Sequence, residues 1–319
     1  MRPSRLLASA LIALALVTGA SPPATSGAAA GASGAEPLPR VIDLPRKWQP
    51  EGITSDGRSL FVGSLRHGGI WAMDLFTGRK RIVSAGAKGR VAVGVDYDRR
   101  RDLVWVAGGG AGTVRAHDAR TGRIRARYDF GDGRFINDLT VTRRAVYATD
   151  SMSDQLVVVP LPRRADRLAP RTRARTLDLT GDFELVVNDF NLNGIEHDGG
   201  WLLAVQTANG KLYRINPRTG VTRLVDVVGA RLNNGDGLEL KGETLYVVRN
   251  FNNLVVALQL DERLTSAERV AGLRHRTLDV PTTAAVARRA LWAVNARFGP
   301  EGPTERVRYW VTRLRLAHQ

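Results

Sequence analysis

The sequence predicts an all-β protein, a six-bladed β-propeller built of four-stranded blades. From residue 40 onward, no segment of the 319-residue chain shows sustained helical periodicity. Short apolar runs rich in Val, Leu, Trp and Tyr alternate with Gly, Asp-Gly and Asn-Gly turns, a pattern typical of strands joined by hairpins. A recurring phrase divides the chain into units of roughly 40 to 50 residues, which is the size of a propeller blade.

The recurring phrase is a polar residue, usually followed by Gly, that precedes a strand, a tight turn and a second strand. Its clearest copy lies at residues 233–248. We call the residue at the start of the first strand of each phrase its head, and one head falls in each predicted blade. The heads are Glu51, Val93, Asn137, Asn193, Asp236 and Thr282.

Two further patterns complete the predicted ring. An Asp/Asn-x-x-Thr-Gly turn, beginning at Asp74, Asp118 and Asn216, is expected to join the third and fourth strands of three blades. The last unit ends near residues 309–314. Residues 40–44 at the start of the domain are expected to supply the outermost strand of this last blade and so to close the ring.

Residues 1–35 are predicted to be a signal peptide and a low-complexity spacer, and residues 36–319 the propeller domain. Arg2 and Arg5 precede an apolar run at residues 6–17, which is too short to span a bilayer, and small residues follow at 18–20. The alternative, an uncleaved anchor, would also place the domain outside the cell. No other apolar run approaches spanning length, so we expect a secreted protein with no membrane span after signal removal.

Composition narrows the possible chemistry. The chain has no cysteine, which excludes disulfides and thiolate metal sites. Its formal charge is +16, but the arginines are scattered and form no basic helix or aromatic-basic platform, so no nucleic-acid partner is expected. The positive field could still attract anionic cell-wall polymers.

The heads are the candidate site. In a propeller the first strand of each blade lines the central tunnel, so the six heads should converge at one tunnel mouth. Two of them are carboxylates, Glu51 and Asp236, and two are carboxamides, Asn137 and Asn193. Such hard oxygen donors suit one divalent cation, Ca²⁺ first, with Mn²⁺, Mg²⁺ or Zn²⁺ as alternatives. The competing interpretation is that polar residues line a water-filled tunnel.

Polar loops are expected to surround this mouth. The loops between second and third strands open on the same face and carry His67, Asn209 and Asn250. Together with Thr282 at the sixth head, these residues are candidates for binding a small-molecule substrate in a concave pocket.

Other catalytic arrangements find no support. The five histidines lie in different units without metal-ligand spacing, and no Gly-x-Ser-x-Gly elbow exists. The glycine-rich run at residues 108–112 precedes no predicted helix, so it is a hairpin turn and not a nucleotide loop.

Four motifs together resemble the senescence marker protein, gluconolactonase and luciferin-regenerating enzyme-like family, over roughly residues 50–298. They lie at residues 50–52, 134–138, 193–195 and 236–238. The resemblance implies a six-bladed propeller whose tunnel-mouth cation is held by Glu51, Asn193 and Asp236. It also implies that Asn137 faces substrate and metal and that Arg134 contacts substrate. The chain departs from the family at two places. It has one extra residue between Arg134 and Asn137, and it has Glu239 or Leu240 where the family usually has Asp.

The expected activity is therefore metal-assisted hydrolysis of a lactone or related ester, with a sugar lactone as one expected substrate. The cation would polarise the carbonyl and activate water, Asp236 would be the general base, and Asn137 would contribute to catalysis. The first alternative is a non-catalytic propeller that binds a cell-wall glycan or a protein partner. The second is a propeller enzyme of another class, a lyase or a strictosidine-synthase-like enzyme.

Overall fold

The computed structural model describes residues 38–299 and 307–317. The predicted signal peptide and spacer at residues 1–35 lie outside these ranges. Within them, no helix is long and apolar enough to cross a membrane.

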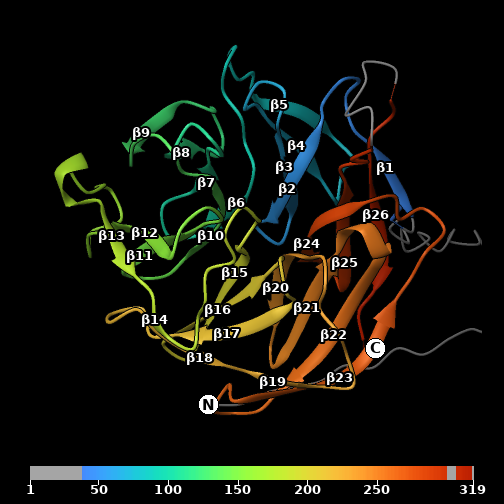
Figure 1. Cartoon of the computed structure of the whole chain (residues 1–319). Coiled ribbons are helices and arrows are strands. Elements are labelled where there is room, and N and C mark those ends of the chain that lie inside the picture. Colours follow the sequence, from blue (N-terminus) through green and yellow to red (C-terminus); the bar gives the residue numbers. More distant parts are fainter. Residues whose placement is uncertain (1–37, 300–306, 318–319) are drawn as a thin grey trace, which may run out of the picture. The chain divides into compact units, whose positions relative to one another are not determined.

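Six sheets stand around a common centre as the blades of a propeller (Figure 1), which confirms the predicted fold. Blade 1 consists of β2 (Pro50–Ser55), β3 (Ser59–Ser64), β4 (Ile70–Asp74) and β5 (Lys80–Ser84). Blade 2 consists of β6 (Val95–Asp98), β7 (Leu103–Ala107), β8 (Thr113–Asp118) and β9 (Ile124–Asp129). Blade 3 consists of β10 (Ile136–Val141), β11 (Ala145–Asp150), β12 (Gln155–Pro160) and β13 (Arg175–Asp178).

Blades 4 and 5 each have a fifth strand that the sequence did not reveal. Blade 4 consists of β15 (Leu192–Asp198), β16 (Trp201–Gln206), β17 (Lys211–Ile215) and β18 (Val221–Leu224), with β14 (Thr180–Gly181) added in parallel. Blade 5 consists of β20 (Gly235–Lys241), β21 (Thr244–Arg249), β22 (Leu254–Leu260) and β23 (Ser266–Leu273), with β19 (Asp226–Val228) added in parallel. Two short 3-10 turns complete the described elements, η1 (Arg171–Arg173) and η2 (Asn250–Asn252).

Blade 6 closes the ring with strands from both ends of the domain. It consists of β24 (Pro281–Ala287), β25 (Ala290–Asn295), β26 (Trp310–Arg315) and, outermost, β1 (Val41–Asp43). Ile42 of β1 is registered with Val311 of β26 in an antiparallel pair. The predicted closure by an N-terminal strand is therefore confirmed.

The shared Asp/Asn-x-x-Thr-Gly turn joins third and fourth strands as predicted. In blade 1, Oδ1 of Asp74 accepts hydrogen bonds from the N–H groups of Phe76 and Thr77. The N–H of Gly78 then donates to the carbonyl of Asp74 at 2.9 Å. Gly78 has φ +71°, a left-handed conformation that glycine adopts without steric cost.

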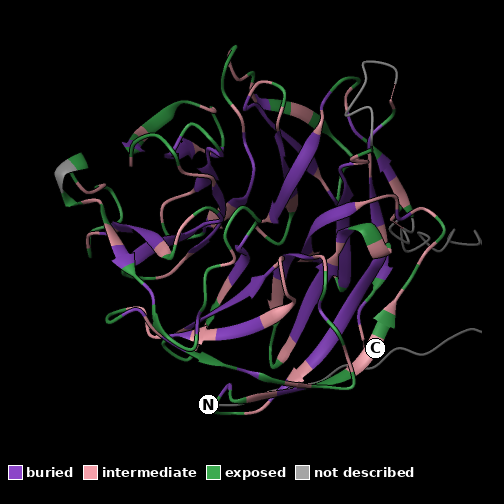
Figure 2. Cartoon of the chain, viewed as in Figure 1, coloured by how far each residue is buried: buried purple, intermediate pink, exposed green. Residues whose placement is uncertain are grey.

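Apolar side chains fill the gaps between successive blades. Six buried clusters are present, and each combines residues from two neighbouring blades. Buried residues follow the inner and middle strands, while exposed residues gather on the outer strands and loops (Figure 2). Because every blade packs on two others, the inner strands are held in a fixed ring.

The heads interrupt the inner strands as β-bulges. In blade 1, Pro50 pairs with Ser64 and Ile53 with Val62, so Glu51 and Gly52 together face the single residue Gly63. The same register shift occurs at the heads of blades 3, 4, 5 and 6. A bulge re-aims a side chain out of the regular alternation. Blade 2 has no such shift, and its head, Val93, precedes β6.

The glycine after a head is required by the approach of the next blade. A Cβ on Gly52 would lie 2.3 Å from the carbonyl oxygen of Val93, the next head. A Cβ on Gly194 would lie 2.3 Å from the carbonyl oxygen of Asp236. The repeated polar-Gly phrase therefore records two constraints, a side chain turned to the tunnel and a backbone contact between neighbouring inner strands.

Candidate functional site

A cavity of about 460 Å³ opens at the tunnel mouth. Its floor is formed by four heads that bear oxygen atoms, Glu51, Asn137, Asn193 and Asp236, and by Val93 of the second blade. The predicted convergence of heads from different blades is thus observed. The remaining lining residues are Leu65, Phe135, Asp189, Phe190, Thr207, Ala208, Asn234, Asn250, Phe251 and Phe298.

The two carboxylates of the floor are buried and electrostatically coupled. Glu51 is 6% exposed and Asp236 is 3% exposed. Burial, and then the nearby charges of Asp236 and Asp138, raise the pKa of Glu51 well above its usual value. Burial also raises the pKa of Asp236, to about 7, against the opposing effect of hydrogen bonds from Asn250 and Asn193. Two buried acids at one point favour either a shared proton or a bound cation.

The amides are held by their nitrogen atoms. Nδ2 of Asn137 donates to Oγ of Ser151 at 2.9 Å, and Nδ2 of Asn193 donates to Oγ1 of Thr207 at 3.2 Å. Each amide therefore keeps its carbonyl oxygen as the remaining polar atom, which is the atom that a cation or an N–H donor would bind.

Asn250 acts differently. It lies on η2, and its Nδ2 donates to Oδ2 of Asp236 at 2.8 Å. Its own carbonyl oxygen accepts the N–H of Phe251 at 2.7 Å. Both ends of this amide are engaged, so Asn250 orients Asp236 and fixes the loop that carries Phe251.

The floor fits a hard divalent cation. Oε2 of Glu51 is buried without a hydrogen-bond partner among the described residues, which leaves a buried acidic oxygen uncompensated. With the carboxylate of Asp236 and the amide oxygens, it makes an all-oxygen donor set of the kind that Ca²⁺ and Mg²⁺ prefer. No group of three or more His, Cys, Asp or Glu side chains in the described ranges is arranged to hold a metal, so the amides are essential to this fit.

Four residues predicted to bind substrate do not line the cavity. Nη1 of Arg134 pairs with Asp150 at 2.8 Å, and its other nitrogens donate to Phe130 and Gln155. His67 packs edge-on against Trp48, and its Nδ1 accepts the N–H of Gly69.

The other two are also engaged elsewhere. Nδ2 of Asn209 donates to Gln206, and its Oδ1 accepts the N–H of Lys211. Oγ1 of Thr282 donates to the carbonyl oxygen of Glu51 at 2.7 Å, and Thr282 is fully buried. Of the predicted substrate-binding residues, Asn137 and Asn250 are the two that the structure brings to the cavity.

The sequence did not reveal the aromatic side chains around the mouth. We call Phe135, Phe190, Phe251 and Phe298 the aromatic wall; they come from three loops and from residue 135, next to β10. Their spacing follows no strand or helix period, so no sequence pattern marks them. The local signals available are a phenylalanine two residues before a head, as at Phe135, and a phenylalanine in a polar loop, as at Phe251.

A second group of carboxylates lies further along the tunnel, three positions beyond the head in blades 2, 4 and 5 and one position beyond it in blade 3, at a rise of about 3.3 Å per residue. This inner acidic ring consists of Asp96, Asp138, Glu196 and Glu239, which line a cavity of about 20 Å³. Backbone N–H groups of the next blade satisfy three of them: Val141 donates to Asp96 at 2.8 Å, Ile195 to Asp138 at 3.4 Å, and Val286 to Glu239 at 2.5 Å. These carboxylates therefore connect neighbouring blades.

The fold and the mouth define the chain as a six-bladed β-propeller with an oxygen-rich site at one end of its tunnel. Comparison of the sequence with protein-family models and with curated proteins gives no match. Solved structures share the fold. The major allergen Mala s 1 of Malassezia sympodialis has a TM-score of 0.65 at 14% identity, covering 87% of this chain and 96% of its own.

Two enzymes also share the fold. The luciferin-regenerating enzyme has a TM-score of 0.59 at 10% identity and covers 87% of this chain and 95% of its own. A streptogramin B lyase has a TM-score of 0.57 at 13% identity, with 88% coverage of both chains. At these identities the similarity establishes the propeller fold, and function has to be argued from the site.

Proposed function

We propose that this protein is a secreted, divalent-cation-dependent hydrolase of lactones or related esters, with its active site at the tunnel mouth. One observation carries the proposal. Two buried carboxylates, one with an unpartnered oxygen, and two amides held by their nitrogens meet on the floor of a 460 Å³ cavity. The motif resemblance to gluconolactonase-like proteins agrees with this assignment.

Glu51, Asn193 and Asp236 would hold the cation, with Ca²⁺ as the first candidate and Mn²⁺, Mg²⁺ and Zn²⁺ as alternatives. A bound divalent cation polarises a carbonyl oxygen and lowers the pKa of a water molecule. Asp236 is the candidate base, because its carboxylate is buried on the floor of the cavity, where it can orient a water molecule and accept its proton. Asn250 holds Oδ2 of Asp236 at 2.8 Å and so fixes the orientation of this base.

Asn137 is proposed to contact the substrate. Its Nδ2 is engaged by Ser151, whose Oγ in turn donates to the carbonyl of Leu192 at 2.7 Å. This chain of hydrogen bonds from blade 3 to β15 fixes the amide before a substrate arrives. A preorganised polar group loses little free energy on binding or in the transition state.

The test is a panel of lactones and aryl esters assayed with protein that has been stripped by EDTA and then loaded with each cation. We expect turnover that depends on the cation and is lost in Asp236→Asn. Incorporation of one oxygen from ¹⁸O-labelled water would identify hydrolysis, whereas a lyase would release product without it. Hydrolysis that survives both chelation and Asp236→Asn would refute the proposal.

The matched control is Glu196→Gln, which makes the same kind of change in the inner acidic ring, three positions beyond Asn193 on β15. It should leave cation dependence and turnover intact. Circular dichroism and melting temperature should show both variants folded, which separates loss of chemistry from loss of structure.

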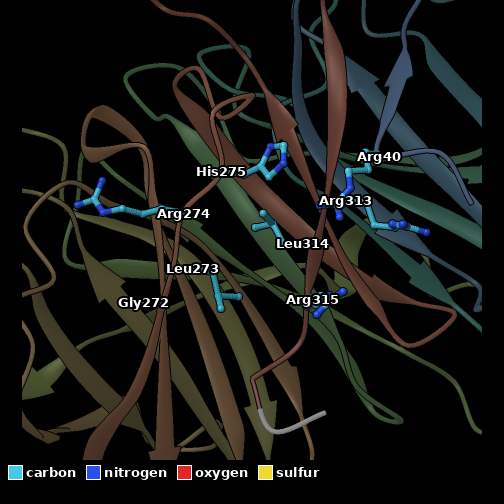
Figure 3. A pocket seen from close by; sticks show the side chains of 8 residues that line it. All are labelled: Arg40, Gly272, Leu273, Arg274, His275, Arg313, Leu314 and Arg315. Carbon is cyan, nitrogen blue, oxygen red and sulfur yellow. The ribbon is translucent and has the colours of Figure 1, made fainter.

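One observation favours a second candidate, a module that binds anionic cell-wall polymers. A cleft of about 320 Å³ lies between β23 and β26 and is lined by four arginines and a histidine (Figure 3). Arg40 and Arg313 are adjacent, since the N–H of Arg313 donates to the carbonyl of Arg40 at 2.8 Å. In the described part of the chain, neither they nor Arg274 and Arg315 form an ion pair with an acidic side chain.

This candidate predicts binding to purified teichoic acid that survives EDTA and weakens as salt is added. Arg40→Ala/Arg313→Ala should reduce that binding, while the control Arg79→Ala/Lys80→Ala, which removes two exposed charges on another blade, should not. Equal losses in the two variants would indicate attraction by net charge alone.

A further inference from the structure

We infer that the substrate of the mouth is a neutral ester or lactone that carries an aryl or alkyl group, rather than a polyhydroxylated sugar lactone. This inference rests on the proposed function for its reacting group and on the aromatic wall for its substituent. The wall surrounds the floor with four phenylalanine rings. Phe251 is 60% exposed and Phe190 is 43% exposed, so much of their apolar surface is in water in the free protein.

The wall is preformed. Phe190 meets Phe135 edge to face with ring centroids 5.2 Å apart. The loop that carries Phe190, residues 182–191, is fixed by Asn191, which is 1% exposed. Oδ1 of Asn191 accepts from Val186 and Gln206, at 2.8 and 2.7 Å. Nδ2 of Asn191 donates to the backbone carbonyls of Ser151, Val186 and Asp189.

In blade 5, one element, η2, orients both the floor and part of the aromatic wall. In η2, Asn250 holds Asp236 at 2.8 Å while the next residue, Phe251, stands at the mouth. A substituent that packs against Phe251 would therefore lie close to the carboxylate proposed as the base. Burying apolar surface of the ligand against these rings stabilises the complex in proportion to the area removed from water.

Polar groups on the cavity walls offer little to a sugar. Oγ1 of Thr207 already donates to the carbonyl of Gly235 at 2.6 Å and accepts from Asn193. Nδ2 of Asn234 donates to Asn252, and Oδ1 of Asp189 accepts the N–H of Phe190. Hydroxyl groups brought against these engaged wall atoms would lose water without gaining an equivalent partner there, which is unfavourable.

Charge restricts the substrate further. Among the described residues that line the cavity there is no Lys, Arg or His, whereas Glu51, Asp236 and Asp189 are present. A phosphorylated or carboxylated substrate would meet no cationic side chain there. The lining of the cavity therefore favours an uncharged molecule with its carbonyl at the floor and its apolar part against the phenylalanines.

The experiment measures binding and turnover separately along one homologous series. Calorimetric titration with γ-lactams, from the unsubstituted ring to a hexyl substituent, reports binding of molecules that are not lactones. Hydrolysis of the matching γ-lactones, with glucono-δ-lactone for comparison, reports kcat/KM. We expect affinity and kcat/KM to rise about threefold to fourfold for each methylene that leaves water, until the wall is covered. Glucono-δ-lactone should be the poorest substrate.

Phe251→Ala, and Phe190→Leu as a milder change in the packed loop, should each reduce the gain in affinity and in kcat/KM from the hexyl group, measured relative to the unsubstituted ring in the same variant, at least severalfold. Phe76→Ala is the matched control, because Phe76 is 61% exposed and lies on blade 1 away from the cavity. An affinity that does not depend on chain length, or a preference for glucono-δ-lactone, would overturn the inference. Chain-length-dependent lactam binding without any lactone turnover would support the inference and reject the proposed hydrolase.

Discussion

The mouth and the inner acidic ring hold carboxylates on the same inner strands, but their partners differ. Asp138 of the ring, 7% exposed, accepts backbone N–H groups from Leu139 and from Ile195 of the next blade. Glu51 at the mouth, 6% exposed, leaves Oε2 without a partner in the described ranges and faces a second acid, Asp236. Buried charge alone therefore does not mark a site. Buried charge left uncompensated at a cavity does.

The largest expected effect comes from breaking a backbone contact between neighbouring inner strands, since these strands carry both the mouth and the inner acidic ring. Gly194→Ala would place a Cβ 2.3 Å from the carbonyl oxygen of Asp236, and neither strand can retreat because both are inner strands of packed blades. We expect a loss of about 3 kcal/mol or more in the free energy of unfolding, or failure to fold. Gly110→Ala is the control, since nothing lies within 4 Å of its added Cβ. Equal melting temperatures for the two variants would contradict this account of the polar-Gly phrase.

The next effect separates the two levels by cation binding. At a free cation concentration of 100 times Kd, the native protein should gain about 2.7 kcal/mol of stability. Asp236→Asn should lose this gain, while Glu196→Gln in the inner acidic ring should keep it. Differential scanning fluorimetry of EDTA-stripped protein with Ca²⁺, Mn²⁺, Mg²⁺ and Zn²⁺ measures it. Loss of the gain in Glu196→Gln alone would move the cation deeper into the tunnel.

The inner acidic ring should make the free energy of unfolding depend on pH. Burial raises the pKa of Glu239 to about 8, above its unfolded value near 4.5, so the folded state holds this proton more tightly. Stability should therefore fall as pH rises between these values, by at most about 1.4 kcal/mol per pH unit for one proton and less where water screens the group.

Glu239→Gln keeps an oxygen to accept the N–H of Val286 and removes the titration. Its melting temperature should vary less between pH 5 and 8 than that of the native protein, with Asp96, Asp138 and Asp236 among the buried acids that provide the residual slope. Asp261, half-buried and hydrogen-bonded to its own turn, provides the control variant Asp261→Asn, which should leave the slope over this window unchanged. An equal slope in Glu239→Gln and in the native protein would show that Glu239 is ionised in the folded state at all these pH values.

The smallest effect concerns the support of one amide. Ser151→Ala removes the acceptor for Nδ2 of Asn137, a hydrogen bond worth about 0.5–1.5 kcal/mol. We expect kcat/KM to fall up to about tenfold with cation affinity nearly unchanged, because Asn137 is assigned to substrate and not to the cation. A weakened cation affinity with normal kcat would reverse those two roles.

The sequence predicted the frame of the molecule and the floor of the site for one physical reason. Glu51, Asn193 and Asp236 each stand at a bulge and are followed by the Gly that the next blade requires, so a structural constraint repeats them in register. The closing strand at Val41–Asp43 was predictable because a four-stranded blade lacked one strand. Glu196 and Glu239 stand three positions after their heads, a regularity that could have revealed the inner acidic ring.

The rest depends on contacts that no local pattern encodes. Arg134 turns to Asp150, sixteen residues away, so a motif position did not become a cavity residue. His67 likewise packs on Trp48, a residue distant in the sequence, and does not line the cavity. Phe190 and Phe251 lie on loops of unequal length from different blades, and it is the closed ring that brings them together. The added strands β14 and β19 are two and three residues long and pair in parallel, too short to show a period.

The pairing of Val41–Asp43 with Trp310–Thr312 makes the order of folding depend on the whole domain. Blade 6 cannot assemble until residues on either side of five other blades have met, and such distant pairing is slow because a long loop must close first. During that time β26 exposes an unpaired sheet edge, on which strands of other chains could add. A circular permutant opened at the exposed turn near Gly78, with its old ends joined, would make the blade 6 sheet continuous and should refold faster with less aggregation.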